Sequence, residues 1–409
     1  MIILGIETSC DETGVCLIEA KNNKLEVLGN QLYSQVAKHQ EFGGVMPMLA
    51  KREHAKNLVP LLRKCLEEAE HNLTPTLPLT NGRGKKNFLP SLDKEGLREV
   101  ENILIREPEL LTELKKLLET VEKPAIDAIA VTSGPGLEPA LWVGITFAQA
   151  LSTAWDIPLI PTNHMEGHIL VASLEKLKNE ESPSKAKETP HFLIQKIKYP
   201  ALALLISGGH TQLVLIKNNL DYKIIGNTCD DALGEAYDKV ARLLGLPYPG
   251  GKIISELAKK EKLEFPNKKP PYPLPRPMLH SKDLNFSFSG LKTAVLYTLK
   301  KISSIDDKVK QEIALEFENS VLDVLTKKTE QAIEEFNPQT LIIGGGVSAN
   351  PQIRANLEKI CQKYQIKFLV PEVSASTDNA LMIALAGYVN ILAGKKSVID
   401  FRANGNLSL

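Results

Sequence analysis

The sequence has few cysteines, few aromatic residues and no excess of charge of either sign. Its 409 residues include five cysteines, which are scattered and never form a Cys-x-x-Cys pair. This number and spacing argue against a disulfide framework and against a zinc site made of thiolates. Lysine plus arginine and aspartate plus glutamate both number 49, so no overall field steers the protein onto a polyanion.

Long apolar runs are also missing. No stretch reaches the roughly 18 uncharged apolar residues that a membrane-spanning helix needs. The N-terminus, MIILGIETSC, enters an apolar strand pattern directly, without the basic region and long apolar segment typical of a signal peptide. We therefore expect a cytoplasmic protein. Hydrophobic residues make up 43% and charged residues 24%, a composition typical of globular proteins with a sizeable core.

Predicted strands and helices alternate along the chain, which favours the α/β class. Two strand–glycine turn–strand units, at residues 4–18 and 202–216, suggest two related α/β lobes with a cleft between them. Three parts are expected: an N-terminal lobe over 1–175, a C-terminal lobe over 199–380, and a C-terminal helix and tail over 381–409 that packs back on the N-terminal lobe.

Two polar segments interrupt this pattern. Residues 71–123 begin with a run rich in proline and glycine and continue with charged helical material, so we expect an inserted, largely helical surface subdomain. Residues 177–198 form a second polar spacer. A third segment, Lys252–Lys282, has eight lysines and arginines against three glutamates. It is our candidate for nucleic-acid contact, although a solvated surface loop has the same composition.

Two histidines have the spacing of metal ligands. His164 and His168 stand four residues apart in TNHMEGHIL, near the start of a predicted helix, where both imidazoles share one face. A capping and a packed histidine give the same pattern. Asp378, behind the capping residues Ser376 and Thr377 of a predicted helix, is the best third ligand. Two histidines and a carboxylate suit Fe(II) or Zn.

Two glycine-rich turns follow predicted strands. The segment Leu205–Gly209, LISGG, places a hydroxyl and two glycines where backbone N–H groups can approach a phosphate or carboxylate, or where a β-hairpin simply turns. The run Gly344–Gly346 lies between a strand and a helix, and Asn350 follows it with both a donor and an acceptor. It suits a nucleotide base and ribose, and an ordinary strand-to-helix turn also has this pattern.

Two acidic segments have two interpretations each. Asp238, in DDALGEAYDK ahead of Tyr248–Gly251, suits recognition of a ribose hydroxyl, but an acid-rich helix start explains it on helix-dipole grounds. The first loop, Glu7–Thr13, has the acids and hydroxyls of a phosphate or Mg²⁺ loop, and a capped strand turn explains it equally well.

In this order, nine motifs resemble the bacterial tRNA threonylcarbamoyladenosine transferase family: GIETSCDET, GGVMPMLAKREH, SGPGL, NHMEGH, LISGGHTQL, GEAYDKVARLLGLPYPGG, FSFSGLKTAV, GGGVSAN and STDNA. The resemblance covers most of the chain outside residues 71–123 and about 177–198. It implies a two-lobed actin/Hsp70/sugar-kinase-like (ASKHA) α/β fold. It also implies transfer of a threonylcarbamoyl group from threonylcarbamoyl-AMP to N6 of the adenosine beside the anticodon in tRNAs that read ANN codons, with release of AMP.

The resemblance further implies a ligand set and partners. One divalent metal, Fe(II) or alternatively Zn(II), is held by His164, His168 and Asp378. The implied substrate contacts are Leu205, Ile206, Ser207, Gly208, Gly209, Asp238, Gly251 and Asn350. The implied partners are tRNA, threonylcarbamoyl-AMP, an inactive paralogous homologue and a small P-loop ATPase. Two residues depart from the family: Met48 replaces a common Glu, and Ser255 replaces an Asp of some members.

Three other functions compete with this interpretation. A kinase or ATPase on the same fold uses glycine loops for phosphates but leaves the two histidines and the aspartate without a role. A metalloendopeptidase lacks support because Glu166, between the histidines, points away from them on a helix. A non-catalytic nucleotide-binding scaffold with a structural metal would call for a closed, four-ligand site.

Overall fold

The computed structural model divides the chain into two units, each with its own β-sheet and hydrophobic core. The structure describes residues 1–72, 94–177, 189–266 and 269–409. Unit 1 comprises Met1–Ala37, Val45–Gln195 and Asp378–Leu409. Unit 2 comprises Lys38–Gly44 and Lys196–Thr377.

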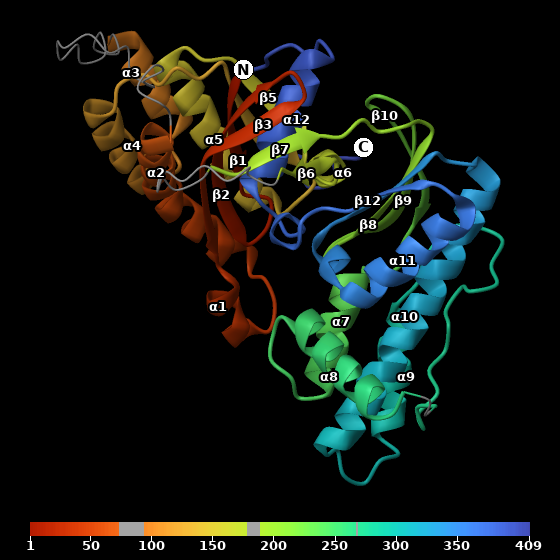
Figure 1. The fold of residues 1–409 in the computed structure, drawn as a ribbon. Helices are drawn as coiled ribbons and strands as arrows, with labels where there is room; N and C mark the ends of the chain where they lie inside the picture. Colours follow the sequence, from red (N-terminus) through yellow and green to blue (C-terminus); the bar gives the residue numbers. More distant parts are fainter. Residues whose placement is uncertain (73–93, 178–188, 267–268) are drawn as a thin grey trace, which may run out of the picture. The chain divides into compact units, whose positions relative to one another are not determined.

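A seven-stranded sheet in the order β5-β4-β1-β2-β3-β7-β6 forms the centre of unit 1 (Figure 1). Neighbours among β1, β2 and β3 are antiparallel, whereas β4 and β5 continue the sheet parallel to β1. At the other edge, β7 and β6 add as antiparallel strands. The strands are β1 (Ile2–Glu7), β2 (Glu12–Lys21), β3 (Lys24–Ser34), β4 (Ala128–Gly134), β5 (Leu159–Asn163), β6 (Leu174–Lys176) and β7 (His191–Ile194).

Helices pack on both faces of this sheet. Because side chains alternate along a strand, Leu4 and Ile6 of β1 face the core formed with α2, α4 and α5, whereas Gly5 faces α12. A Cβ on Gly5 would lie 2.4 Å from the carbonyl oxygen of Ala380, so only glycine lets α12 approach β1 this closely. The helices are α2 (Pro47–Asn72), α3 (Lys94–Ile103), α4 (Pro108–Thr120), α5 (Glu138–Trp155), α6 (His164–Val171) and α12 (Ala380–Leu392), and the short α1 (Val36–His39) follows β3.

The described part of residues 71–123 is helical, as expected, and contributes side chains to the core of unit 1. Val100 of α3 and Leu110, Leu114 and Leu117 of α4 are buried in the core cluster that α2 and α5 also build. The three leucines recur at helical spacing, so they form a core-facing stripe. The expected helical segment is therefore present as α3 and α4 and packs on the core of unit 1, and residues 73–93 lie outside the described residues. The end of the second polar spacer contributes β7.

Unit 2 is built on a five-stranded sheet in the order β10-β9-β8-β11-β12. The strands are β8 (Ala201–Ile206), β9 (Thr211–Asn218), β10 (Asp221–Asn227), β11 (Thr340–Gly344) and β12 (Lys367–Leu369). The helices are α7 (Leu233–Leu243), α8 (Gly250–Glu264), α9 (Ser289–Leu299), α10 (Asp307–Phe336) and α11 (Pro351–Tyr364). Leu202, Leu204 and Ile206 of β8 face the core that these helices share.

The two sheets repeat one topology. In each, three antiparallel strands are followed by two parallel ones, as β3-β2-β1-β4-β5 in unit 1 and β10-β9-β8-β11-β12 in unit 2. The two strand–glycine turn–strand units expected from the sequence are β1–β2 and β8–β9. The predicted α/β class with two related halves is confirmed. Within the described residues, every helix is too short or too polar to cross a membrane.

Candidate metal centre and ligand-binding turns

The two histidines occupy the start of α6, directly after β5. The side chain of Asn163 caps the helix by accepting hydrogen bonds from the N–H groups of Met165 (2.8 Å) and Glu166 (3.3 Å). One helical turn then brings the rings of His164 and His168 to a centroid distance of 4.7 Å, with their planes at 86°. Both side chains are buried, so their positions are fixed by the surrounding protein.

Asp378 completes the predicted trio. Its Oδ1 lies 3.1 Å from Nε2 of His168 and 3.4 Å from Nε2 of His164. The three candidate ligand atoms all lie within 4.8 Å of one another. Asp378 precedes α12 by two residues, and the capping residue is Asn379, whose Oδ1 accepts from the N–H of Met382 at 3.0 Å. The prediction that Ser376 and Thr377 cap this helix is wrong.

A buried carboxylate holds the other side of His164. Glu7, the last residue of β1, places its Oε2 3.1 Å from Nδ1 of His164. Thr132 of β4 donates its hydroxyl to the same oxygen at 2.7 Å, and the N–H of Ser9 donates to Oε1 at 2.5 Å. The hydroxyl of Ser9 also lies 3.2 Å from Nδ1 of His164. The imidazole of His164 thus lies between Glu7 and Asp378.

Charges around the trio shift its pKa values in different directions. Burial lowers the pKa of His164, but Asp378 and Glu7 outweigh it and raise that pKa well above its ordinary value. Burial lowers the pKa of His168, which keeps this ring neutral. Burial raises the pKa of Asp378, yet the two imidazoles offset this and hold it well below its ordinary value. Asp378 is therefore a carboxylate.

The donor set fits a divalent transition metal. Two imidazole nitrogens and one carboxylate oxygen converge, and such a set leaves coordination positions open. Nδ1 of His168 is buried without a hydrogen-bond partner among the described residues, so Nε2 is its atom directed at Asp378. As expected, Glu166 lies away from the trio, with Oε2 3.7 Å from Nζ of Lys395.

The LISGG segment forms a hairpin with exposed backbone. Leu205 and Ile206 end β8 in the core, and the N–H of Ser207 donates to the carbonyl of His210 at 2.8 Å, closing the turn to β9. A Cβ on Gly208 or Gly209 would meet no described atom within 4 Å. The β-hairpin interpretation is confirmed, and its two glycines present bare backbone to open space. Contact with a phosphate or carboxylate stays a prediction.

The second glycine turn lies beside the first. β11 runs parallel to β8 and pairs Gly344 with Leu205, so both turns follow the same edge of the sheet. Gly345 has a φ of +86°, and a Cβ there would lie 2.4 Å from the carbonyl oxygen of Ile206. Glycine is needed because the two turns pack backbone against backbone.

The side chain of Asn350 is engaged within the protein. Its Oδ1 caps α11, accepting from the N–H groups of Gln352 (2.8 Å) and Ile353 (3.3 Å). Its Nδ2 donates to Oγ of Ser255 at 2.8 Å and to Oε1 of Glu318 at 2.7 Å. The expectation that this amide offers a spare donor and acceptor is corrected: both ends have protein partners.

Glu318 is a residue that sequence reasoning missed. It is buried on α10, and Oγ of Ser255 donates to its Oε1 at 2.6 Å. Burial raises the pKa of this carboxyl. Since an aspartate at position 255 would place a second carboxylate against it, serine suits this chain. Met48, the other departure from the family, is a largely exposed side chain.

Asp238 and Gly251 lie at the junction of α7 and α8. Oδ1 of Asp238 accepts a hydrogen bond from the N–H of Gly250 at 2.7 Å, which ties the start of α8 to α7. A Cβ on Gly251 would meet no described atom within 4 Å. All the expected substrate contacts belong to unit 2, whereas the trio belongs to unit 1.

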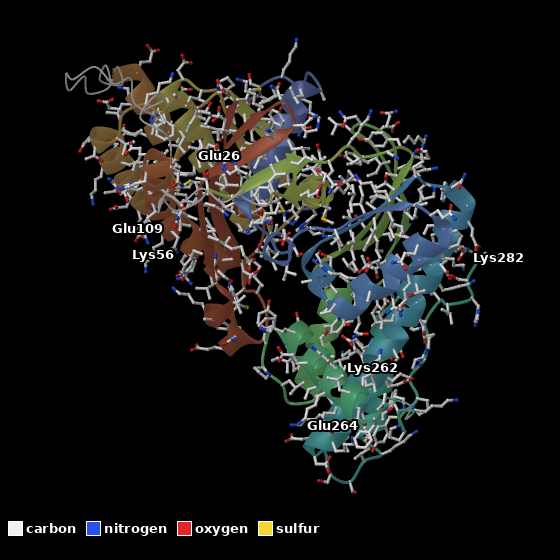
Figure 2. The ribbon with its side chains drawn as sticks, in the orientation of Figure 1. Glu26, Lys56, Glu109, Lys262, Glu264 and Lys282 are labelled. Atoms are coloured by element: carbon white, nitrogen blue, oxygen red, sulfur yellow. The ribbon has the colours of Figure 1, made fainter. Side chains whose placement is uncertain are left out.

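Among the described residues, the basic segment Lys252–Lys282 gathers only in part: Lys262, Lys269 and Arg276 line one pocket beside α10. Lys308 of α10 pairs with Glu261, and Lys328 of the same helix donates to Oγ of Ser281 at 2.7 Å. These two lysines are 20 residues apart on α10, a rise of about 30 Å. Figure 2 accordingly shows Lys262 and Lys282 far from each other. Lys282 therefore lies apart from that group, and nucleic-acid contact by the segment stays a prediction.

Comparison with known proteins was made for sequence and for fold. Residues 26–76 and 108–385 match the family model described as TsaD, tRNA N6-adenosine threonylcarbamoyltransferase. A protein of that name from Chromobacterium violaceum is 39% identical over 395 residues, covering 96% of this chain and 93% of its own. One from Thermosipho africanus is 38% identical over 412 residues and 100% of both chains. One from Bacillus subtilis is 37% identical over 411 residues, covering 100% of this chain and 96% of its own.

Solved structures with a similar course of chain are more distant. Component A of the (R)-2-hydroxyglutaryl-CoA dehydratase of Acidaminococcus fermentans is 12% identical, with a TM-score of 0.45, covering 97% of this chain and 100% of that one. A ROK hexokinase from Thermus thermophilus is also 12% identical, with a TM-score of 0.39, covering 96% and 100%. The sequence matches extend over nearly all of the chain. The chain therefore belongs to the TsaD family of tRNA N6-adenosine threonylcarbamoyltransferases, and it is a transferase that modifies tRNA.

Proposed function

We propose that the protein transfers a threonylcarbamoyl group from threonylcarbamoyl-AMP to N6 of the adenosine beside the anticodon in tRNAs that read ANN codons. The convergence of His164, His168 and Asp378 in a chain of this family is the observation that carries the proposal. In the reaction, a bond forms between adenine N6 and the carbamoyl carbon. The bond from that carbon to the phosphate oxygen breaks, AMP leaves with the electron pair, and N6 loses a proton.

The chain needs no covalent nucleophile for this reaction. Cys10 lies in the first loop beside Asp11, and burial raises the pKa of its thiol well above the ordinary value. A thiol with such a raised pKa carries little thiolate, which is the nucleophilic form. The weakly nucleophilic adenine amine therefore depends on positioning and electrostatic stabilisation.

His164, His168 and Asp378 would hold one divalent ion, which we propose to be Fe(II), with Zn(II) as the alternative. Such an ion supplies Lewis-acid polarisation of a carbonyl or phosphoryl oxygen when bound. Asp378 remains ionised because the two imidazoles hold its pKa low, so it is ready as a ligand. The burial of both histidines excludes bulk water from their side of the site.

In unit 2 we propose that Leu205–Gly209, Asp238 and Gly251 contact the adenylate donor and that Asn350 supports this contact from the start of α11. The exposed backbone N–H groups of the two glycines in the hairpin turn suit the negative charge of the AMP phosphate. Asn350 would contribute by holding the start of α11 beside the glycine turn, because its amide is already bonded within the protein.

The partners are proposals as well. The family name names tRNA as the substrate. An inactive paralogous homologue and a small P-loop ATPase are the proposed protein partners, and the cytoplasm is the proposed compartment.

A nucleoside assay tests the function. Purified protein, with and without the two proposed partners, is incubated with unmodified tRNA, threonylcarbamoyl-AMP and Fe(II) or Zn(II). The tRNA is then digested, and threonylcarbamoyl-adenosine is sought by mass spectrometry. We expect product from the wild type and none from Asp378→Asn. His168→Ala should also be inactive. The matched control is His71→Ala, which should be active because His71 is an exposed residue at the end of α2. Absence of product under every condition, with ATP turnover instead, would favour a kinase or ATPase.

A further inference from the structure

Hydrogen bonds hold the side chain of Glu7, the last residue of β1, in one position. It is fully buried, and each of its carboxylate oxygens accepts a hydrogen bond: Oε1 from the N–H of Ser9 and Oε2 from the hydroxyl of Thr132. A buried carboxylate is costly unless such donors satisfy it. These two donors leave Oε2 directed at Nδ1 of His164, 3.1 Å away.

The two ring nitrogens of His164 therefore have different partners. Nδ1 faces the Glu7 carboxylate, and Nε2 faces Asp378 at 3.4 Å. A carboxylate is only an acceptor, so the hydrogen of a neutral His164 ring belongs on Nδ1. That leaves the lone pair on Nε2, the atom on the side of the trio.

We propose that Glu7 is a positioning residue, which fixes the orientation and the hydrogen of His164 so that Nε2 is the metal-binding atom. This inference rests on the metal site proposed above. Hydrogen bonding of a ligating histidine to a carboxylate also makes the ring a stronger ligand. The negative charge of Glu7 further offsets the buried charge of a divalent ion.

The second histidine gives an internal comparison. Nδ1 of His168 is buried and has no hydrogen-bond partner among the described residues, so no carboxylate holds that ring from its Nδ1 side. Ser9 also reaches Nδ1 of His164, at 3.2 Å, but a neutral hydroxyl can donate as well as accept and does not specify where the hydrogen lies. A change at Glu7 should therefore affect His164 and leave His168 as it is.

Metal affinity is the first measurement. Zn(II) and Co(II) binding to the full-length protein is measured by competition with a chromophoric chelator. We expect Glu7→Gln, which keeps the shape but removes the charge, to weaken binding about 10–100-fold. Thr132→Val, which removes one of the donors that hold Glu7, should weaken it less. The matched control is Asp127→Asn, since Asp127 accepts from the N–H of Ile2 at 2.7 Å at the opposite end of β1; its metal affinity should equal that of the wild type.

The ring hydrogens are the second measurement. In Zn(II)-loaded protein with ¹⁵N-labelled histidines, we expect His164 to carry its hydrogen on Nδ1, with a strongly downfield proton signal. Glu7→Gln should move that signal upfield and leave the His168 signals in place. A folded Glu7→Gln protein with metal affinity within twofold of the wild type would overturn the proposal. So would a wild-type spectrum with the His164 hydrogen on Nε2, which decides the question even where the variant does not fold.

Neither measurement uses tRNA or the donor. Failure of the nucleoside assay with normal metal binding and a Glu7-dependent His164 signal would remove the proposed reaction and leave this inference standing. If the nucleoside assay gives product but Glu7→Gln binds metal as tightly as the wild type, the proposed reaction stands and the positioning role of Glu7 is wrong.

Discussion

Replacing Gly5 by alanine should destabilise unit 1. A Cβ at this central position of β1 would lie 2.4 Å from the carbonyl oxygen of Ala380, 2.7 Å from the backbone nitrogen of Ala384 and 2.8 Å from its Cβ. Two of these atoms belong to the backbone of α12, so the helix itself has to shift. Overpacking a core costs about 1–3 kcal/mol, and we expect about 3 kcal/mol here because no side-chain rotation relieves the clash.

The same shift should weaken metal binding. Asp378 stands two residues before α12, so its carboxylate moves with the start of that helix. His164 and His168 lie on another helix, α6, so a shift of α12 changes their distances from Asp378. We expect the zinc affinity of Gly5→Ala to fall about tenfold, which corresponds to about 1.4 kcal/mol.

Tryptophan fluorescence measures the unfolding of unit 1 selectively. The chain has two tryptophans, Trp142 and Trp155, and both lie on α5 of that unit. A loss of about 3 kcal/mol in a unit of this size corresponds to a fall in Tm of roughly 6–12 °C.

Two glycines provide graded controls. A Cβ on Gly14 would lie 3.0 Å from the backbone nitrogen of Ala380, so Gly14→Ala should lower the Tm less than Gly5→Ala. The nearest atom to a Cβ on Gly290 is 3.9 Å away, so Gly290→Ala should unfold like the wild type when helix content is followed by circular dichroism. A Tm for Gly5→Ala within 2 °C of the wild type, roughly 1 kcal/mol or less, would refute the argument.

Three further predictions concern unit 2. Glu318→Gln should raise the free energy of unfolding at pH 7, because burial raises the pKa of Glu318 and the folded protein favours its protonated form. The difference in free energy of unfolding between this variant and the wild type should shrink as the pH falls through the raised pKa toward 4.5. Calorimetry at several pH values measures it, and a difference that stays constant with pH would contradict the argument. Ser255→Asp should cost about 1–3 kcal/mol at pH 7 by placing a second carboxylate beside Glu318, and the cost should largely vanish when combined with Glu318→Gln. Asp230 accepts hydrogen bonds from the N–H groups of Phe288 and Ser289 at 2.8 and 3.2 Å at the start of α9, so Asp230→Ala should cost about 1–2 kcal/mol in urea unfolding. Burial raises the pKa of Asp230, but hydrogen bonds from the hydroxyls of Ser287 and Ser289 and from these two N–H groups outweigh it and lower that pKa. The stabilisation by Asp230 should therefore be present above pH 3.8 and lost as the pH falls further, and an equal loss in the alanine variant would contradict this.

The fold class could be predicted because its signal is local. The alternation of strands and helices and the two strand–glycine turn–strand units are visible in the sequence, and each corresponds to an observed pair of strands. The position of α3 and α4 could not be read in this way. Their charged residues predicted an inserted surface subdomain, and the sequence alone does not show that the leucines of α4 join the core of unit 1.

In the candidate site, too, local features could be predicted from the sequence and contacts between distant elements could not. The i, i+4 spacing of His164 and His168 is a local feature, and the structure brings Asp378 to it as the resemblance implied. The hydrogen bonds from the amide of Asn350 to Ser255 and Glu318 could not be foreseen, because these two residues come from α8 and α10 at no characteristic spacing in the sequence. The side-chain direction of such residues is decided by helix packing.

The contacts of Glu7 depend on the order of the strands. β1, β4 and β5 are adjacent and parallel, so their carboxyl ends meet at one edge of the sheet. Glu7 ends β1, Thr132 lies near the end of β4, and His164 follows β5, which places a carboxylate, a hydroxyl and an imidazole in one row. Residues 125 and 157 positions apart in the chain become hydrogen-bonded neighbours of Glu7 in this way. Parallel pairing thus brings the first acid of the loop Glu7–Thr13 beside the histidine that follows β5. The sequence of the loop alone could not show this contact, and its interpretation as a phosphate or Mg²⁺ loop stays a prediction.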